Sequence, residues 1–249
     1  MDQVIVILTL AGFAAGVVDA IAGGGGLVTV PVLLAAGLDP QTVLATNKGQ
    51  SIFGSFTSFT LFLRSGRVDR TRLWPTFGAA ALGSALGASL VLRLDRKLLQ
   101  PIIIALLIVA SLAVLVKKRD GTEPLPLVAR SPRLFAGLIA LVLGTYDGFF
   151  GPGTGTFLVV AYAFFFGDEL VRASANAKVA NFASNLAAFL TFLGGSAIVW
   201  RIALPMGVAQ VLGSAVGTRL AITRGAGLVR AVTVVMALGI ALRLLWSMR

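Results

Sequence analysis

The sequence predicts an all-α polytopic membrane protein built from two inverted-topology repeats of about five helical segments each, eight to ten segments in total. Three observations carry this prediction. Mean hydropathy is +0.93 and only 12% of the residues are charged, whereas a soluble domain has about 25%. Apolar stretches recur along the chain, and short motifs of the first half reappear in the second half in the same order.

The apolar stretches alternate with polar breaks. They lie near 3–20, 27–37, 42–63, 74–92, 98–116, 134–150, 155–166, 171–193, 202–222 and 227–246. Most of them approach the roughly 17 to 25 residues that a membrane-spanning helix needs. Segments 27–37 and 155–166 are too short to span fully, so we expect broken or re-entrant helices at the glycine-rich stretches that precede them.

A polar, proline-containing stretch divides the chain. It predicts an N-terminal transmembrane repeat over 1–117, a cytoplasmic linker over 118–133 and a C-terminal transmembrane repeat over 134–249.

The halves align at a shift of 130 residues, with two single-residue gaps upstream. The motif LGSALG at 82–87 recurs as LGSAVG at 212–217. The other aligned pairs are Pro75 and Pro205, Lys48 and Lys178, Gly26 and Gly155, and Asp19 and Asp147. Because five segments is an odd number, equivalent helices of the two halves should cross the membrane in opposite directions.

The basic residues predict the orientation. Thirteen flank the segments on one side: Arg64, Arg67, Arg70, Arg72, Lys117, Lys118, Arg119, Arg130, Arg133, Arg172, Arg219, Arg224 and Arg230. Six flank the other side: Arg93, Arg96, Lys97, Arg201, Arg243 and Arg249. By the positive-inside rule the first side is cytoplasmic. We therefore expect a multi-pass protein of the bacterial inner membrane with both termini periplasmic or extracellular.

Residue types exclude several kinds of chemistry. The chain has no Cys and no His, which rules out disulfides, Cys or His metal ligands and Ser-His or Cys-His nucleophiles. We expect no metal, no cofactor and no enzymatic activity. The net charge of +11 does not predict nucleic-acid binding, because the basic residues lie between apolar segments instead of on a soluble basic face.

Four ionisable residues lie within apolar surroundings: Asp19, Lys48, Asp147 and Lys178. A charge near the bilayer centre costs at least about 2.5 to 3.5 kcal/mol, so such residues mark either a transport pathway or a paired structural site. Since they form two repeat-related pairs, we expect them to converge near the midplane. Asp19 and Asp147 are candidates for proton coupling.

Glycine-rich runs follow both aspartates. They read AGGGGLVTVP at 22–31 and FGPGTGTF at 150–157. Such runs break a helix, and the helix that restarts directs N–H groups and its positive dipole end at an anion. The candidate ligands are Gly24, Gly25, Gly26, Gly153, Thr154 and Gly155. Close helix packing is the alternative, and we favour it for the glycine pairs Gly12/Gly16, Gly83/Gly87 and Gly213/Gly217.

Two polar stripes follow, in ATNKGQSIFGS at 45–55 and ASANAKVANFASN at 173–185. Helical spacing puts Lys48, Ser51 and Ser55 on one face, and Lys178, Asn181 and Asn185 repeat that spacing. With Asn47 and Asn176 they are candidate ligands of a small oxyanion, because ammonium, hydroxyl and amide groups supply charge and directed donors. In the alternative interpretation each Lys only neutralises a buried Asp.

The order of these motifs resembles the TauE/SafE family of membrane transporters, also called the 4-toluene sulfonate uptake permease family. The resemblance rests on an Asp, a glycine-rich break and an apolar segment, followed by the TNK helix and, in the second half, the NAK helix. It covers residues from about 10 to 245. It implies transport of sulfite or sulfonates such as sulfoacetate, often outward.

The residues and the resemblance together predict a secondary transporter that exports a small sulfur oxyanion or organosulfonate by alternating access. The expected partners are the anion and membrane lipid, with a homodimer left open. Two alternatives remain: a passive anion channel with the same basic residues, and a membrane-embedded enzyme whose two aspartates form an acid/base dyad.

Overall fold

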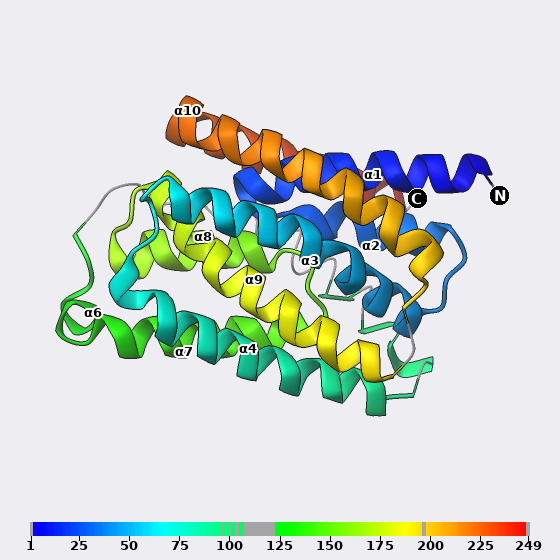
Figure 1. The fold of residues 1–249 in the computed structure, drawn as a ribbon, viewed down its shortest axis with the longest axis horizontal. Coiled ribbons are helices and arrows are strands. Elements are labelled where there is room, and N and C mark those ends of the chain that lie inside the picture. Colours follow the sequence, from blue (N-terminus) through cyan, green and yellow to red (C-terminus); the bar gives the residue numbers. More distant parts are fainter. Residues whose placement is uncertain are drawn as a thin grey trace.

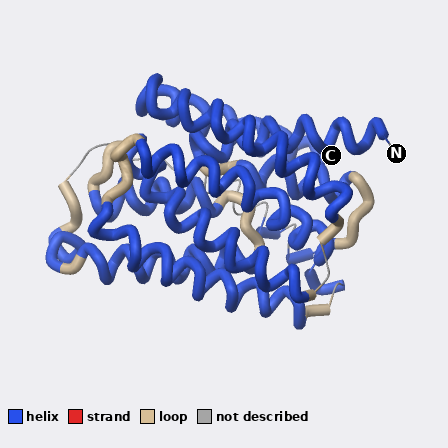
Figure 2. The backbone as a smooth tube through the Cα atoms, in the orientation of Figure 1, coloured by secondary structure: helices blue, strands red, loops and turns tan. Residues whose placement is uncertain are grey.

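The computed structural model describes residues 2–95, 97–99, 101–102, 105–106, 123–195 and 198–247, with side chains up to Val232 except those of Asp2 and Arg230. These residues form helices and short connections, and none of them lies in a strand (Figure 2). Most of the segment expected at 98–116 lies outside them. So do Arg96, Lys117, Lys118, Arg119 and Arg249, and the side chains of Arg230 and Arg243.

The helices follow the predicted segments to within a few residues. The first half contains α1 (Asp2–Ala22), α2 (Gly25–Ala35), α3 (Pro40–Arg64) and α4 (Arg70–Arg93). The second half contains α7 (Pro132–Phe149), α8 (Thr154–Phe166), α9 (Leu170–Gly194) and α10 (Trp200–Ser247). The segments expected at 202–222 and 227–246 both lie in α10, which consists of two helical stretches separated by a kink at Gly225, where φ is 71° and ψ is −160°. A short helix in the linker, α6 (Pro126–Arg130), was not predicted.

Local sequence explains where these helices begin and end. The Asp39 carboxylate accepts a hydrogen bond from Thr42 N at 3.2 Å and Pro40 occupies the first turn of α3, two strong helix-start signals. Asp69 caps α4 in the same way through Thr71 N, at 2.9 Å. Gly66 and Gly167 have positive φ just beyond α3 and α8, a conformation that glycine adopts without steric cost.

Helices at equivalent places in the two halves make equivalent contacts. α4 packs on α7, and α1 packs on α10, with α3 and α9 crossing between these two pairs (Figure 1). The predicted packing glycines lie in these interfaces: a Cβ at Gly12 or Gly16 would meet the α10 backbone, and one at Gly83 or Gly87 would meet the α7 backbone. Small residues therefore let the paired helices approach closely.

The two ends of the bundle differ in charge. The α3–α4 and α8–α9 connections, the start of α7 and the α10 kink lie at one end, on the left of Figure 1. That end carries Arg64, Arg67, Arg70, Arg130, Arg133, Arg172, Arg219 and Arg224. The opposite end carries Arg93, Lys97 and Arg201, and both chain termini lie toward it (Figure 1). Which end faces the cytoplasm stays a prediction.

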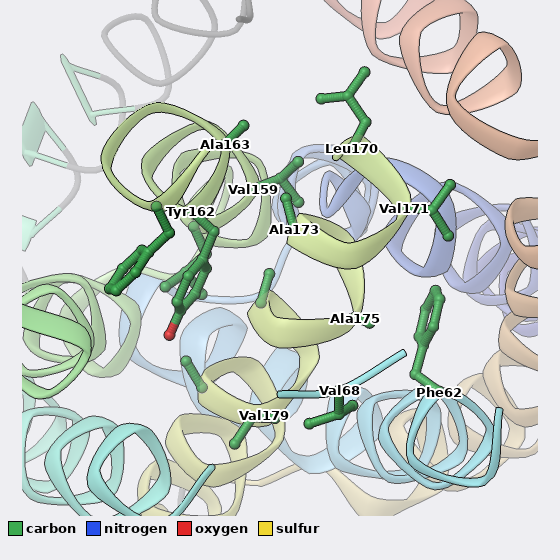
Figure 3. Packing of buried hydrophobic residues seen from close by; sticks show 14 of the residues in the cluster. Phe62, Val68, Val159, Tyr162, Ala163, Leu170, Val171, Ala173, Ala175 and Val179 are labelled. Carbon is green, nitrogen blue, oxygen red and sulfur yellow. The ribbon is translucent and has the colours of Figure 1, made fainter. Parts of the chain in front are cut away.

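Two apolar clusters enclose a polar layer. The first, at the arginine-rich end, contains Phe62, Val68, Tyr162 and Leu170 (Figure 3). The second, toward the other end, contains Leu33, Val43, Phe150, Phe192 and Met206. Along α3 the polar stripe that begins at Lys48 lies between Val43 and Phe62, so apolar packing lies on both sides of the polar residues.

Two of the described helices, Gln3–Ala22 and Arg70–Arg93, are long and apolar enough to cross a membrane by length and hydropathy alone. α2 and α8 are apolar but have only 11 and 13 residues, or about 16 and 20 Å of helix. Both fall short of the roughly 30 Å hydrocarbon core. Re-entrant insertion and opposite membrane orientation of the repeats stay predictions.

Candidate functional site

The two glycine-rich breaks meet at the centre of the bundle. Thr156 N donates to Gly23 O at 3.1 Å, and the Thr156 hydroxyl donates to Ala22 O at 2.8 Å. Gly23 has a φ of 78°, and a Cβ there would overlap the backbone of Gly155. The breaks therefore combine close backbone packing with helix restarts, two roles that the sequence treated as alternatives.

Two lysines approach this crossing from α3 and α9. Lys48 and Lys178 each occupy the ninth position of their helix, and their side chains are only 3% and 0% exposed. Each lysine pairs with the aspartate of the other half. Lys48 Nζ lies 2.8 Å from Asp147 Oδ2, and Lys178 Nζ lies 2.8 Å from Asp19 Oδ2.

The neighbours of the two ion pairs differ. Lys48 Nζ also donates to Asn185 Oδ1 at 3.2 Å, and the Ser184 hydroxyl donates to Asp147 Oδ2. Lys178 Nζ instead donates a second bond to the main-chain oxygen of Asp19, at 2.5 Å. Pairing offsets the cost of burying these charges, and the remaining ammonium protons and carboxylate lone pairs need such additional acceptors and donors.

A small cavity of about 20 Å³ lies beside the ion pairs. It is lined by Asp19, Gly23, Gly25, Gly26, Asn47, Lys48, Ser51, Ser55, Asp147, Gly151, Gly155, Asn181, Asn185 and Gln210. This volume accommodates about one water molecule. A sulfite or sulfonate is larger, so this conformation would have to widen before such an anion could enter.

Most of the predicted site residues line this cavity, but five do not: Lys178, Asn176, Gly24, Gly153 and Thr154. Lys178 lies behind Asp19. Gly24 and Gly153 cap the short helices α2 and α8, and the Thr154 hydroxyl donates to Gly151 O at 2.8 Å.

Asn176 belongs to a different cluster, at the arginine-rich end. Its side chain accepts from Asp69 N and donates to Asp168 Oδ2, both at 2.8 Å. Arg72 is only 4% exposed and binds both carboxylate oxygens of Asp168, at 3.0 and 2.9 Å. Its guanidinium lies 4.3 Å from the centre of the Phe166 ring.

The sequence interpretation of Arg72 was therefore incomplete, because it counted Arg72 only as an orienting surface charge. The scarcity of acidic residues could have indicated a partner for Arg72, because Asp69 and Asp168 are two of only ten acidic residues in the chain. In this cluster, the α3–α4 connection is tied to the α8–α9 connection. Burial raises the pKa of Asp69, but the Thr71 hydroxyl, Arg72 and Arg172 lower it, and the net shift is downward.

The comparison with known proteins agrees with the motifs. The family model described as sulfite exporter TauE/SafE matches residues 8–244. The chain belongs to the TauE/SafE family. The ion pairs, the glycine crossing and the cavity all lie within the matched range.

Several relatives are similar to this TauE/SafE member over nearly their whole length. A probable membrane transporter protein of Haemophilus influenzae is 38% identical, over 94% of this chain and 92% of the relative. The probable membrane transporter protein ORF9 of a Sinorhizobium species is 37% identical, over 96% and 91%. The probable membrane transporter protein YfcA of Escherichia coli K12 is 35% identical, over 97% and 89%. No solved structure matches the chain.

Proposed function

We propose that this TauE/SafE member is a secondary transporter that moves a small sulfur oxyanion or organosulfonate across the inner membrane by alternating access, as an exporter. The observation that carries the proposal is the pair of buried ion pairs that link the two halves beside a polar cavity. The family description, sulfite exporter, supports the substrate class and the outward direction.

Lys48 is the proposed anion ligand. It lines the cavity together with the hydroxyl groups of Ser51 and Ser55 and the amide of Asn181, which supply charge and directed polar groups. The short helices α2 and α8 begin here, and the first-turn N–H groups of a helix have no acceptor within their own helix. Lys178 acts indirectly in this proposal, by holding Asp19 at the cavity edge.

The proposed alternating-access cycle rests on the ion pairs that connect the halves. A competing anion can take the place of a carboxylate at Lys48, which would release α3 from Asp147 on α7 and let the halves shift. Asp147 and Asp19, the carboxylates of the two ion pairs, are the proposed coupling residues. The apolar clusters on both sides of the cavity favour this cycle over a continuous channel.

The test is sulfite flux in proteoliposomes. We expect saturable flux for the wild type, loss of flux for Lys48→Ala, and unchanged flux for Lys97→Ala, whose side chain is exposed at an end of the bundle. Wild-type flux through a correctly folded Lys48→Ala protein would refute the binding role. Non-saturable flux with unitary conductance steps would favour a channel instead.

Proton coupling has its own test in the same system. We expect Asp19→Asn and Asp147→Asn to make flux insensitive to an imposed pH gradient. Variants that respond to the gradient as the wild type does would refute the coupling role and leave anion transport intact.

A further inference from the structure

The cavity is asymmetric although the sequence repeat is nearly symmetric. Of the lysines in the described part of the chain, only Lys48 lines it. A lysine ammonium has three N–H donors, and that of Lys48 pairs with Asp147 and donates a hydrogen bond to Asn185. No other acceptor for it is found among the described residues. The Lys48 ammonium is therefore a cationic donor that can bind a further acceptor in the cavity.

A glutamine from a different helix faces the same cavity. Gln210 on α10 is 2% exposed and lines the cavity, yet its Oε1 has no hydrogen-bond partner among the described residues. Buried polar side chains nearly always have partners, and leaving one unpaired is destabilising. A water molecule or a ligand in the cavity can supply the missing partner.

Two glycines make room for this side chain. A Cβ at Gly54 on α3 would lie 2.5 Å from Gln210 Cγ, and a Cβ at Gly16 on α1 would lie 3.0 Å from it. At the repeat-equivalent positions, Ala80 takes the place of Gln210 and Ser184 takes the place of Gly54. The long amide and the space for it occur together in only one half.

The difference between Gly54 and Ser184 also changes how the aspartate of each half is hydrogen-bonded. Ser184 donates to the Asp147 carboxylate, so the smaller Ala80 is accompanied by a hydroxyl that satisfies the aspartate. Gly54 has no side chain with which to do the same. One half therefore has an internal Ser184–Asp147 hydrogen bond, whereas the other has an amide oxygen, Gln210 Oε1, without a partner among the described residues.

We propose that Gln210 is an anion ligand, and that with Lys48 it forms a one-sided site for a single small oxyanion. This inference rests on the proposed transport function. Because Oε1 and an anion oxygen are both acceptors, the terminal amide must turn so that its NH₂ group faces the anion, while Lys48 supplies the charge and Asn185 accepts from its ammonium. Gln210 thereby adds a directional contact to a site whose other strong ligand is a point charge.

The experiment compares two side chains on the same helix. Gln210→Met keeps the unbranched shape and removes the amide. Thr218→Val is the matched control: Thr218 is also fully buried on α10 and its Oγ1 also lacks a partner among the described residues, but it does not line the cavity. Gln210→Leu provides a second variant if the first does not fold. Sulfite affinity and the melting temperature without ligand are measured for purified protein, with methanesulfonate as a second probe.

We expect Gln210→Met to weaken sulfite binding roughly ten- to one-hundred-fold, as for loss of a hydrogen bond to a charged group. Its ligand-free melting temperature should equal or exceed that of the wild type, because an unpartnered buried amide is removed. Thr218→Val should match the wild type in affinity.

The outcomes separate the two proposals. Wild-type affinity in Gln210→Met and Gln210→Leu overturns the ligand role of Gln210 and leaves the transport proposal standing. A lower ligand-free melting temperature with unchanged affinity assigns Gln210 a packing role instead. A wild-type protein that binds neither probe refutes the proposed substrate class, and this inference with it.

Discussion

The buried pair of Lys178 and Asp19 should be one of the strongest links between the two halves. At 2.8 Å and an effective dielectric constant of about 20, the Coulomb attraction is about 6 kcal/mol. Lys178→Met leaves the Asp19 carboxylate buried without its counter-ion. Desolvation offsets part of the attraction, so we expect the free energy of unfolding to fall by about 3 to 5 kcal/mol, as when one partner of a buried pair is removed.

The double variant Asp19→Asn/Lys178→Met isolates the charge interaction. Asn retains an oxygen for the 3.4 Å bond from Gly25 N, and neither buried charge remains. We therefore expect the double variant to recover at least half of the loss. The measurement is denaturant unfolding in detergent, followed by tryptophan fluorescence. A single variant that loses less than about 1 kcal/mol, or a double variant that loses the sum of both single changes, would refute the reasoning.

Three further predictions concern the glycine crossing and the arginine-rich end. Gly23→Ala should lower the melting temperature much more than Gly37→Ala: both glycines have positive φ, but only at Gly23 would the new Cβ meet backbone. Equal losses of melting temperature in the two variants would mean that the strain of a positive φ alone sets the destabilisation. Arg72→Lys should reduce stability because Arg72 binds Asp69 through Nε and Asp168 through Nη2, and an ammonium has only one nitrogen for both carboxylates. Thermal unfolding at matched ionic strength checks this, and an unchanged melting temperature would contradict it. Since the folded pKa of Asp69 is lowered, its stabilisation is present above about pH 4 and is lost as the pH falls through that lower value. Asp69→Asn, which keeps a capping side chain, should therefore show a smaller drop in melting temperature between about pH 5 and pH 3 than the wild type.

Most of the secondary structure could be predicted because its signals are local. Apolar periodicity, the Asp39 and Asp69 caps and the glycine breaks act within a few residues, so the helix bounds followed from short windows of sequence. The same holds at Gly225, whose positive φ separates the two helical stretches that the sequence placed at 202–222 and 227–246.

The site was predicted in composition but not in its pairing. The internal repeat identified Lys48, Lys178, Asp19 and Asp147 as four charges that should converge. It could not decide which lysine meets which aspartate, because Lys178 and Asp19 are 159 residues apart and a repeat permits pairing within or between halves. Gln210 and Arg72 were missed as site residues because neither has an equivalent in the other half: the matching positions are Ala80 and Ile202.

The sequence by itself determined the helical class, the family, the repeat and the identity of the buried charges, because these depend on residue type and on spacing along the chain. The tertiary structure alone decided that the ion pairs cross between halves, that Lys48 lines the cavity while Lys178 does not, and that α10 contributes Gln210. These are matters of distance between helices. They are set by the side chains that meet when α1 packs on α10 and α4 packs on α7.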